Sequence, residues 1–290
     1  MEDYDIRVLV HREEPLLLDK DHVHFIKGGL LQVEALEQLL EPGCIVLNLV
    51  YLAASSESEN FAAMNNLARA CANRRVKRLV HCSTAVVVGD TAEDIIEENS
   101  QCNPRTPYEK TKLEIEYLLL NKAGGSFEVT ILRPTAVFGA RGQNLVKLAD
   151  NLTQGSPVIN YFKSSIFNKR SLNLVCVDNV VAAMVFLGET DRKVDKEVFI
   201  ISDDNAVSNN YLDVESLLIK KLLLKEYPIP RIPLPSFLLG VLLKLVGKPQ
   251  SNPSVKFSDK KLITFGFRKP IEFEKGVNKF VDWYRSNENT

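Results

Sequence analysis

The chain lacks an excess of either charge. Its 290 residues include 36 Lys and Arg against 37 Asp and Glu, and the basic residues are scattered along the chain. A protein that wraps nucleic acid needs a concentrated positive surface to neutralise phosphates. We therefore expect no nucleic-acid partner.

Paired cysteines and clustered metal ligands are also missing. The five cysteines contain no CxxC pair, and their odd number disfavours a disulfide framework or a zinc site. His22 and His24 share one strand face without an acidic or cysteine partner nearby, so we expect no bound metal. The cysteines are Cys44, Cys71, Cys82, Cys102 and Cys176. Buried, reduced thiols of this kind are typical of a cytoplasmic protein.

Long apolar runs are absent as well. No run of about 18 uncharged apolar residues occurs, so the sequence predicts no transmembrane segment. The apolar stretch PSFLLGVLLKLVG at 235–247 is too short to span a bilayer and contains a lysine. It could lie on a membrane surface, but a helix that covers a cleft is the favoured interpretation.

What the chain does contain is an alternation of strand and helix patterns. Apolar runs that do not alternate with polar residues occur at 44–52, 76–82 and 129–133, as is typical of parallel strands covered on both faces. Apolar residues recur at helical spacing at 61–71 and, less cleanly, at 113–119. The alternation predicts an α/β fold.

After Gly139 this rhythm becomes irregular. We predict a core of residues 1–139 and a smaller second lobe of residues 140–290, of which 172–202 returns to the core sheet. Leucines at helical spacing in 144–152 suit core packing, and they could also serve a homodimer interface.

A tyrosine and a lysine stand four residues apart in PYEKTK. Because Pro107 favours the first turn of a helix, we expect Tyr108 and Lys112 on one helix face. An ammonium beside a phenol stabilises the phenolate, so the phenol can exchange a proton with a substrate hydroxyl or carbonyl. Such a pair is common by chance, and a solvated helix surface is the alternative.

Two hydroxyl residues follow the apolar run at 76–82. Ser83 and Thr84 stand there in HCSTAVVVGD. Ligands of parallel sheets bind at the carboxyl ends of the strands. This position favours a functional interpretation of the tyrosine and lysine that follow.

Together these segments resemble the extended short-chain dehydrogenases/reductases, in particular the NAD-dependent epimerase/dehydratase family. HCSTAVVVGD is similar to the family's VSSAxVYG, and RPTAVFG at 133–139 is similar to its RPxxVYG. The resemblance covers nearly the whole chain and implies a Rossmann-like doubly wound parallel sheet. It implies that Thr84 hydrogen-bonds the reacting oxygen, with Ser83 as a supporting neighbour at the cofactor. Tyr108 would transfer the proton, and Lys112 would also hold the ribose of NAD or NADP.

The resemblance implies further contacts with the cofactor. NLVYLAA is similar to a turn that packs beside the adenosine and ribose, which assigns Leu49 and Tyr51 to the site. Pro134 and Val137, in RPTAVFG, would border the nicotinamide. Arg12, just past a strand, would pair with a 2′-phosphate and favour NADP, and a solvated charge is the alternative.

The sequence departs from the family at its beginning. The family starts with a strand and a TGxxGxxG turn that binds the pyrophosphate, and neither is present here. Residues 4–10 resemble the family's second strand, so the sheet should lack its first β-α unit and with it a central strand. The family's Gly-Asp-Leu appears as Gly28-Gly29-Leu30, without the aspartate that contacts adenine.

Three explanations account for the missing unit. A true start upstream of Met1 is favoured over a shortened inactive product and over a protein that pairs its strands differently. We expect an NAD(P)-dependent epimerase, dehydratase or reductase that acts on a nucleotide-sugar. The alternatives are a non-catalytic scaffold or regulatory protein that does not bind cofactor, and a reductase of steroid- or flavonoid-type ketones. Ala136 and Val88 replace an asparagine and a tyrosine that contact substrate in the family, which leaves the substrate class open.

Overall fold

The computed structural model describes residues 4–11, 22–123, 125–232 and 252–288. The chain forms two units, each assembled from segments that are separate in sequence. Unit 1 contains Met1–Ser83, Thr111–Ile131 and Leu187–Glu197, and unit 2 contains Thr84–Lys110, Leu132–Phe186 and Val198–Thr290. The predicted division at residue 139 stays a prediction.

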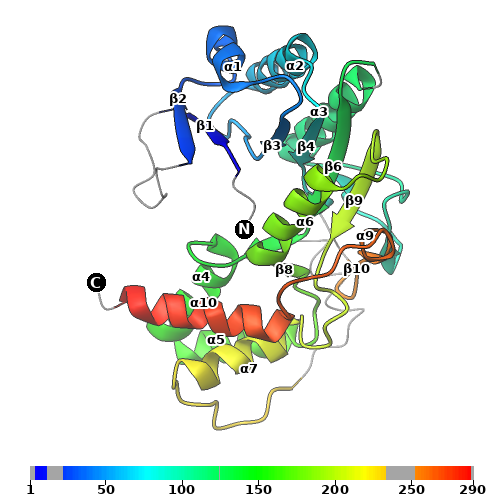
Figure 1. Ribbon diagram of the computed structural model, residues 1–290. Helices are drawn as coiled ribbons and strands as arrows, with labels where there is room; N and C mark the ends of the chain where they lie inside the picture. The colour runs from blue at the N-terminus through cyan, green and yellow to red at the C-terminus, as the bar shows by residue number, and fades with distance from the viewer. Residues whose placement is uncertain (1–3, 12–21, 124, 233–251, 289–290) are drawn as a thin grey trace. The chain divides into compact units, whose positions relative to one another are not determined.

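Unit 1 begins with two short parallel strands. β1 (Ile6–Val10) and β2 (Val23–Lys27) pair along their whole length, with Ile6 opposite Val23. Helix α1 (Val33–Leu39) contacts both strands (Figure 1). A Cβ on Gly28 would lie 2.4 Å from the Cβ of Ala35. The glycine therefore lets α1 approach the end of β2 closely.

A larger sheet of the described residues has the strand order β3-β4-β6-β9. β3 (Ile45–Asn48) and β4 (Arg78–Cys82) are parallel and belong to unit 1. β6 (Glu128–Pro134) and β9 (Glu197–Ile201) run from unit 1 into unit 2. The first four residues of β4 are all buried, as expected of a strand covered on both faces.

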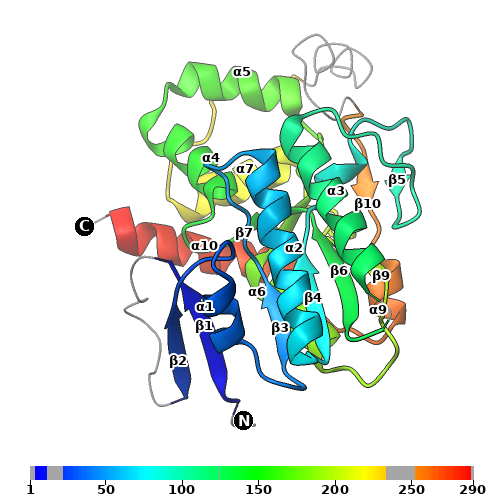
Figure 2. The same ribbon diagram turned by 90° about the horizontal axis from the view of Figure 1, so that it is seen from above.

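Two long helices cover one face of these strands. Helix α2 (Glu57–Arg74) begins where Ser56 and Glu59 form a capping box. Helix α3 (Pro107–Lys122) follows β4 in the chain, and Figures 1 and 2 show α2 and α3 on the same face of β3 and β4. The predicted helical spacing in α2 is confirmed by its buried residues Met64, Leu67, Ala68 and Cys71.

The described strands of unit 1 belong to two separate sheets. β1 pairs with β2 and β3 pairs with β4, and among the described residues no pairing joins β1 to β3. This order agrees with the expectation of a doubly wound sheet interrupted between its second and fourth strands. Apolar side chains of β1 and β3 are partly open to solvent, since Ile6 is 47% and Leu47 is 42% exposed.

Unit 2 packs helices around a core of its own. β7 (Ala136–Phe138) pairs with β8 (Leu174–Cys176), and β5 (Ile95–Ile96) pairs with β10 (Lys256–Phe257). Among the described residues, its α-helices include α4 (Gln143–Gln154), α5 (Pro157–Phe167), α6 (Val177–Glu189, which ends in unit 1), α7 (Tyr211–Lys221), α9 (Lys260–Thr264) and α10 (Phe273–Glu288). Leu145 and Ala149 of α4 are buried in this core, so the leucine spacing at 144–152 serves core packing. A homodimer stays a prediction.

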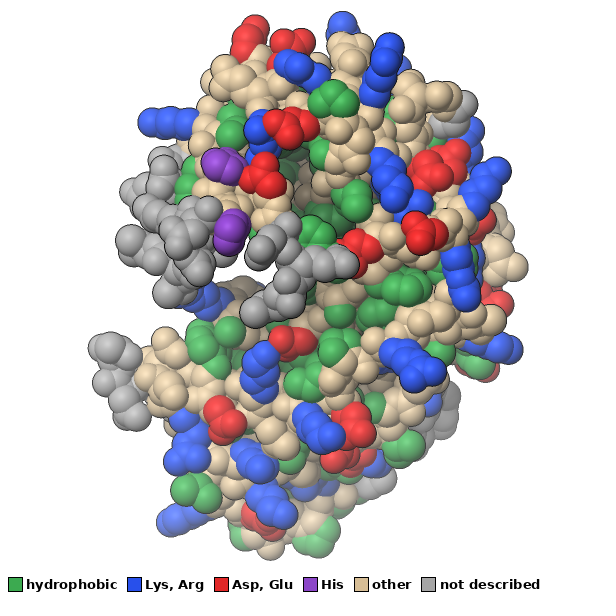
Figure 3. All heavy atoms as spheres, in the orientation of Figure 1, with side chains coloured by type: hydrophobic (Ala, Val, Ile, Leu, Met, Phe, Trp, Pro, Cys, Tyr) green, Lys and Arg blue, Asp and Glu red, His purple; other side chains and the backbone are tan. Residues whose placement is uncertain are grey.

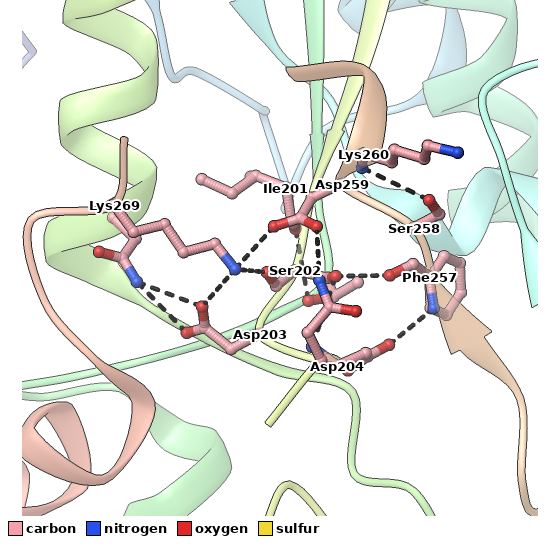
Figure 4. A network of polar contacts seen from close by, with 12 residues as sticks. Ile201, Ser202, Asp203, Asp204, Phe257, Ser258, Asp259, Lys260 and Lys269 are labelled. Atoms are coloured by element: carbon pink, nitrogen blue, oxygen red, sulfur yellow. Dashed lines mark hydrogen bonds and ion pairs between the residues drawn. The ribbon is translucent and has the colours of Figure 1, made fainter. Parts of the chain in front are cut away.

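A buried polar network joins three segments of unit 2 (Figure 4). The ammonium of Lys269 lies 2.9 Å from Oδ1 of Asp203 and 2.7 Å from Oδ2 of Asp259. Asp204 accepts a hydrogen bond from the backbone N–H of Phe257 at 2.7 Å. These contacts tie the loop after β9 to β10 and to the start of α9.

Two interpretations of the sequence are corrected. The strand predicted at 44–52 ends at Asn48, because Oδ1 of Asn48 accepts the N–H of Val50 at 3.1 Å and turns the backbone. His24 does have an acidic partner, since its Nε2 lies 2.9 Å from Oδ1 of Asp5. The register of β1 against β2 brings these two residues together. Arg12 and the stretch 235–247 lie outside the described residues.

On the face shown in Figure 3, basic and acidic side chains are interspersed. No helix within the described ranges is long and apolar enough to cross a membrane.

The segment predicted to return to the core sheet, 172–202, contains two strands. β8 pairs with β7, and β9 belongs to the larger sheet.

Candidate active site

The end of β4 presents two hydroxyl residues in succession. Ser83 is 7% exposed and Thr84 is half-buried. Thr84 has an extended backbone, with φ -158° and ψ 145°, and its hydroxyl accepts the N–H of Val86 at 3.4 Å. This bond caps the short helix η1 (Ala85–Val88) in unit 2. The cap fixes the conformation of Thr84.

Glycine is required where η1 ends. Gly89 has a φ of 66°, and a Cβ there would lie 1.9 Å from the carbonyl oxygen of Asn103. Any side chain would collide with that backbone. The glycine that ends HCSTAVVVG is therefore needed for the turn that follows η1.

Helix α3 starts at a defined point because its first turn is capped. The N–H of Glu109 donates to the hydroxyl of Thr106 at 3.2 Å, and the N–H of Thr106 donates to the Glu109 carboxylate at 3.2 Å. Pro107 then occupies the first helical position, as predicted. Tyr108, which is 43% exposed, and the buried Lys112 follow one turn apart on the same helix.

Lys112 points back at the end of β4. It is 3% exposed, and its Nζ donates to the carbonyl oxygen of Cys82 at 2.9 Å. The ring of Tyr51 lies beside it, with 5.7 Å from Nζ to the ring centroid. Burial lowers the pKa of Lys112, and the nearby Cys82 and Glu116 oppose that shift. The ammonium thus lies beside a carbonyl oxygen and an aromatic ring, within the electrostatic influence of Glu116.

A buried amide and imidazole lie at the ends of β3 and β4. Nδ2 of Asn48 lies 2.9 Å from Nδ1 of His81, and Oδ1 of Asn48 accepts the N–H of Val50. Since Oδ1 is an acceptor, Nδ2 donates and Nδ1 accepts, which places the imidazole proton on Nε2. Burial, and then the charge of Lys112, lowers the pKa of His81 well below its usual value. His81 is therefore neutral, and it lies close enough to Lys112 for that charge to lower its pKa.

The remaining predicted cofactor residues have different environments. Leu49 is 68% exposed and Tyr51 is half-buried in the loop after β3. Pro134 is buried at the end of β6, and Val137 is half-buried in β7. Gly29 donates its N–H to the side chain of Gln32 at 3.0 Å and offers no carboxylate where the family has aspartate.

The predicted site residues are divided between the two units. Unit 1 contributes Leu49, Tyr51, Ser83 and Lys112, and unit 2 contributes Thr84, Tyr108, Pro134 and Val137. Contacts within unit 1 bring Lys112 to Tyr51 and to the strand end that carries Ser83. Chain continuity places Thr84 next to Ser83, and helix α3 places Tyr108 one turn from Lys112. The roles of these residues remain predictions.

The motifs in the sequence do not single out three buried polar residues of this region. His81 and Asn48 contact each other at the ends of β4 and β3, and Glu116 accepts the hydroxyl of Ser83. All three are buried, at 1%, 4% and 0% exposure respectively. The sequence around Glu116 does not separate it from Glu114, which also stands beside apolar residues of the helix and is exposed.

Comparison with solved structures establishes the fold. The Bordetella bronchiseptica enzyme WbmG in complex with NAD matches with a TM-score of 0.72 at 20% identity, covering 97% of this chain and 86% of that one. At this identity the likeness shows the fold alone, which is the expected Rossmann-like α/β arrangement.

Comparison of sequences adds two relatives and a family. The N-acetyl-alpha-D-glucosaminyl-diphospho-ditrans,octacis-undecaprenol 4-epimerase of Escherichia coli O157:H7 is 25% identical over an alignment of 296 positions that covers 92% of this chain and 86% of the relative. The UDP-glucose 4-epimerase of Vibrio cholerae is 31% identical over 65% of this chain and 56% of its own length. The model of the NAD dependent epimerase/dehydratase family matches residues 1–202.

Proposed function

Because this chain belongs to the NAD-dependent epimerase/dehydratase family, we propose that it is an NAD-dependent epimerase, dehydratase or reductase of a nucleotide-sugar. The observation that carries the proposal is the buried ammonium of Lys112, bonded to the end of β4 one helical turn from Tyr108. The name of the Vibrio cholerae relative, a UDP-glucose 4-epimerase, supports a nucleotide-sugar. The Escherichia coli relative is named for a hexose on an undecaprenol diphosphate, so what the two names share is a hexose carried on a diphosphate.

Each residue of the trio has a distinct task in this proposal. Tyr108 is exposed enough to reach a substrate, and its phenol exchanges a proton with the reacting hydroxyl or carbonyl. The ammonium of Lys112 stabilises the phenolate that this exchange creates. The hydroxyl of Thr84 hydrogen-bonds the reacting oxygen and holds it beside the phenol.

The residues around Lys112 fit the nicotinamide riboside end of a dinucleotide. An ammonium has three N–H donors, and the carbonyl of Cys82 accepts one of them, which leaves donors for the ribose hydroxyls. Tyr51 and Leu49 provide an apolar border on the side of β3, and Pro134 and Val137 are proposed to border the nicotinamide. When bound, the nicotinamide accepts or donates the hydride.

Calorimetric titration of the full chain with NAD⁺, NADH and NADPH tests cofactor binding. Turnover is then followed by mass spectrometry and NMR with UDP-glucose, UDP-N-acetylglucosamine and dTDP-glucose. We expect NADH to bind, and we expect Tyr108→Phe to bind it equally well while kcat falls at least about a hundredfold. Such a loss without a loss of binding would locate the defect in proton transfer.

Tyr117→Phe is the matched control. Tyr117 is a 53% exposed tyrosine of the same helix, and its replacement should leave kcat unchanged. Absence of binding at millimolar cofactor would contradict the proposal and favour a non-catalytic scaffold. An active Tyr108→Phe enzyme would contradict the role of the tyrosine. We also propose a cytoplasmic location, which the five free cysteines support.

A further inference from the structure

Glu116 is a carboxylate buried without any exposed surface. It lies on α3 one turn after Lys112 and is 0% exposed. Taking a carboxylate out of water is costly unless hydrogen bonds and an opposite charge compensate. The contacts of Glu116 should therefore include the hydrogen bonds and the opposite charge that compensate for its burial.

Glu116 and Lys112 bind two successive residues at the end of β4. The hydroxyl of Ser83 donates to Oε1 of Glu116, and Nζ of Lys112 donates to the carbonyl oxygen of Cys82 at 2.9 Å. Two side chains one helical turn apart on α3 are thus hydrogen-bonded to adjacent residues at the end of β4. This double contact sets how far α3 lies along β4.

Glu116 also supplies negative charge close to the ammonium. Burial lowers the pKa of Lys112, whereas the charge of Glu116 raises it. The other groups that face Lys112 are the thiol of Cys82, the ring of Tyr51 and the imidazole of His81, which burial keeps neutral. Glu116 is the carboxylate among the groups named here. Its negative charge therefore offsets part of the free-energy cost of burying the ammonium of Lys112.

We propose that Glu116 is a positioning residue for proton transfer, an inference that rests on the proposed function. Through Ser83 it holds the backbone immediately before Thr84, and its negative charge stabilises the ammonium of Lys112 at the end of β4. Glu116 itself touches neither substrate nor reacting atoms in this arrangement.

If Glu116 had a purely structural role, its loss would lower stability without changing the pKa of Lys112. Two other residues of α3 provide controls that separate these effects. The hydroxyl of Thr111, which is 2% exposed, donates to the carboxylate of Glu57 at 2.8 Å and ties α3 to α2. Thr111→Val removes a buried hydrogen bond of α3 without removing a charge near Lys112. Glu114→Gln removes a charge from the exposed face of α3.

An NMR titration of the full chain, labelled with ¹³C at the lysine Cε, measures the state of Lys112 without substrate or cofactor. Loss of one signal in Lys112→Arg assigns it. We expect Glu116→Gln to lower the pKa of Lys112, and Ser83→Ala to lower it less, because the carboxylate is then released but still present. Thr111→Val and Glu114→Gln should leave the titration unchanged, although Thr111→Val lowers the Tm.

The titration separates this inference from the proposed function, since it requires no turnover. An unchanged titration of Lys112 in both Glu116→Gln and Ser83→Ala would overturn the inference, and if Glu116→Gln does not fold, Ser83→Ala decides alone. Where turnover is measurable, the high-pH limb of kcat should move to lower pH in Glu116→Gln. A limb that stays in place while the NMR titration shifts would show that Lys112 does not govern proton transfer.

Discussion

β4 and β1 are parallel strands of unit 1 with five residues each, but they are packed very differently. The first four residues of β4 are buried, whereas Ile6 of β1 is 47% exposed and its other residues are half-buried. β4 lies between β3 and β6, while β1 has β2 as its paired neighbour. The residues proposed for proton transfer thus follow the end of a buried strand or lie on the helix bonded to it, whereas the β1-β2 pair is more exposed to solvent.

The largest difference in stability that we expect between the two strands comes from replacing the arginine of each. Arg78 of β4 is 2% exposed, and its NH1 donates to the carbonyl oxygens of Leu187 and Gly188, at the end of α6, at 2.8 and 2.9 Å. Its Nε donates to the carboxylate of Glu128 at 2.7 Å. Arg78→Ala leaves these acceptors without their donor. We expect a loss of about 3–5 kcal/mol in the free energy of unfolding, measured by urea denaturation.

Arg7 of β1 is the matched control. It donates to the carbonyl oxygen of Gln38 at 3.0 Å and pairs with Glu41, whose side chain is 52% exposed. Since solvent screens such a pair, Arg7→Ala should cost about 1 kcal/mol or less. Equal losses in Arg7→Ala and Arg78→Ala would show that the difference in burial has no energetic consequence.

A smaller difference is expected for apolar side chains. Leu79 of β4 is 0% exposed, so Leu79→Ala removes packed methyl groups and leaves a cavity, at a cost of about 3 kcal/mol. Ile6→Ala, at an exposed position of β1, should cost less than about 1 kcal/mol. The midpoint of thermal unfolding, followed by circular dichroism, ranks the two variants. An Ile6→Ala protein that melts as early as Leu79→Ala would mean that β1 is packed more tightly in solution than its exposure indicates.

The packed strands were also the easiest to predict from sequence. The apolar runs at 76–82 and 129–133 became β4 and β6, since a strand covered on both faces must be apolar on both. The break between β1 and β3 was predictable too, because the resemblance fixed which strand came first. The extent of β3 was not, since the bond from the N–H of Val50 to Asn48 that ends it depends on a side chain.

Buried polar residues account for most of what sequence could not supply. Arg78 and Glu116 look like surface charges in the sequence, and their burial depends on acceptors and donors from distant segments. The pairing of His24 with Asp5 depends in the same way on the register of two strands. The trio of Thr84, Tyr108 and Lys112 was found because motif spacing is local, whereas the residues that support it are assembled only by the fold.

The smallest effect that we expect from the difference in burial between β4 and β1 is a pH dependence of the free energy of unfolding. His81 of β4 is its source. Burial, and then the charge of Lys112, lowers the pKa of His81 well below its usual value of 6.5. Below that value the unfolded chain binds a proton at His81 and the folded chain does not. The free energy of unfolding is therefore complete above the unfolded pKa and falls as the pH drops toward the folded pKa.

Replacement of this one histidine should flatten that dependence. We expect the loss of stability between about pH 7.5 and about pH 5.5, measured by urea denaturation, to be smaller in His81→Gln than in the wild type. His24→Gln, which removes an exposed histidine of β2 paired with Asp5, should retain the wild-type loss at His81. A His81→Gln protein with the full pH dependence would indicate that the imidazole is protonated in the folded state, and hence that the end of β4 is open to water. The contrast between the packed strand and the exposed pair would then fail next to Cys82, the residue of β4 to which Lys112 is bonded.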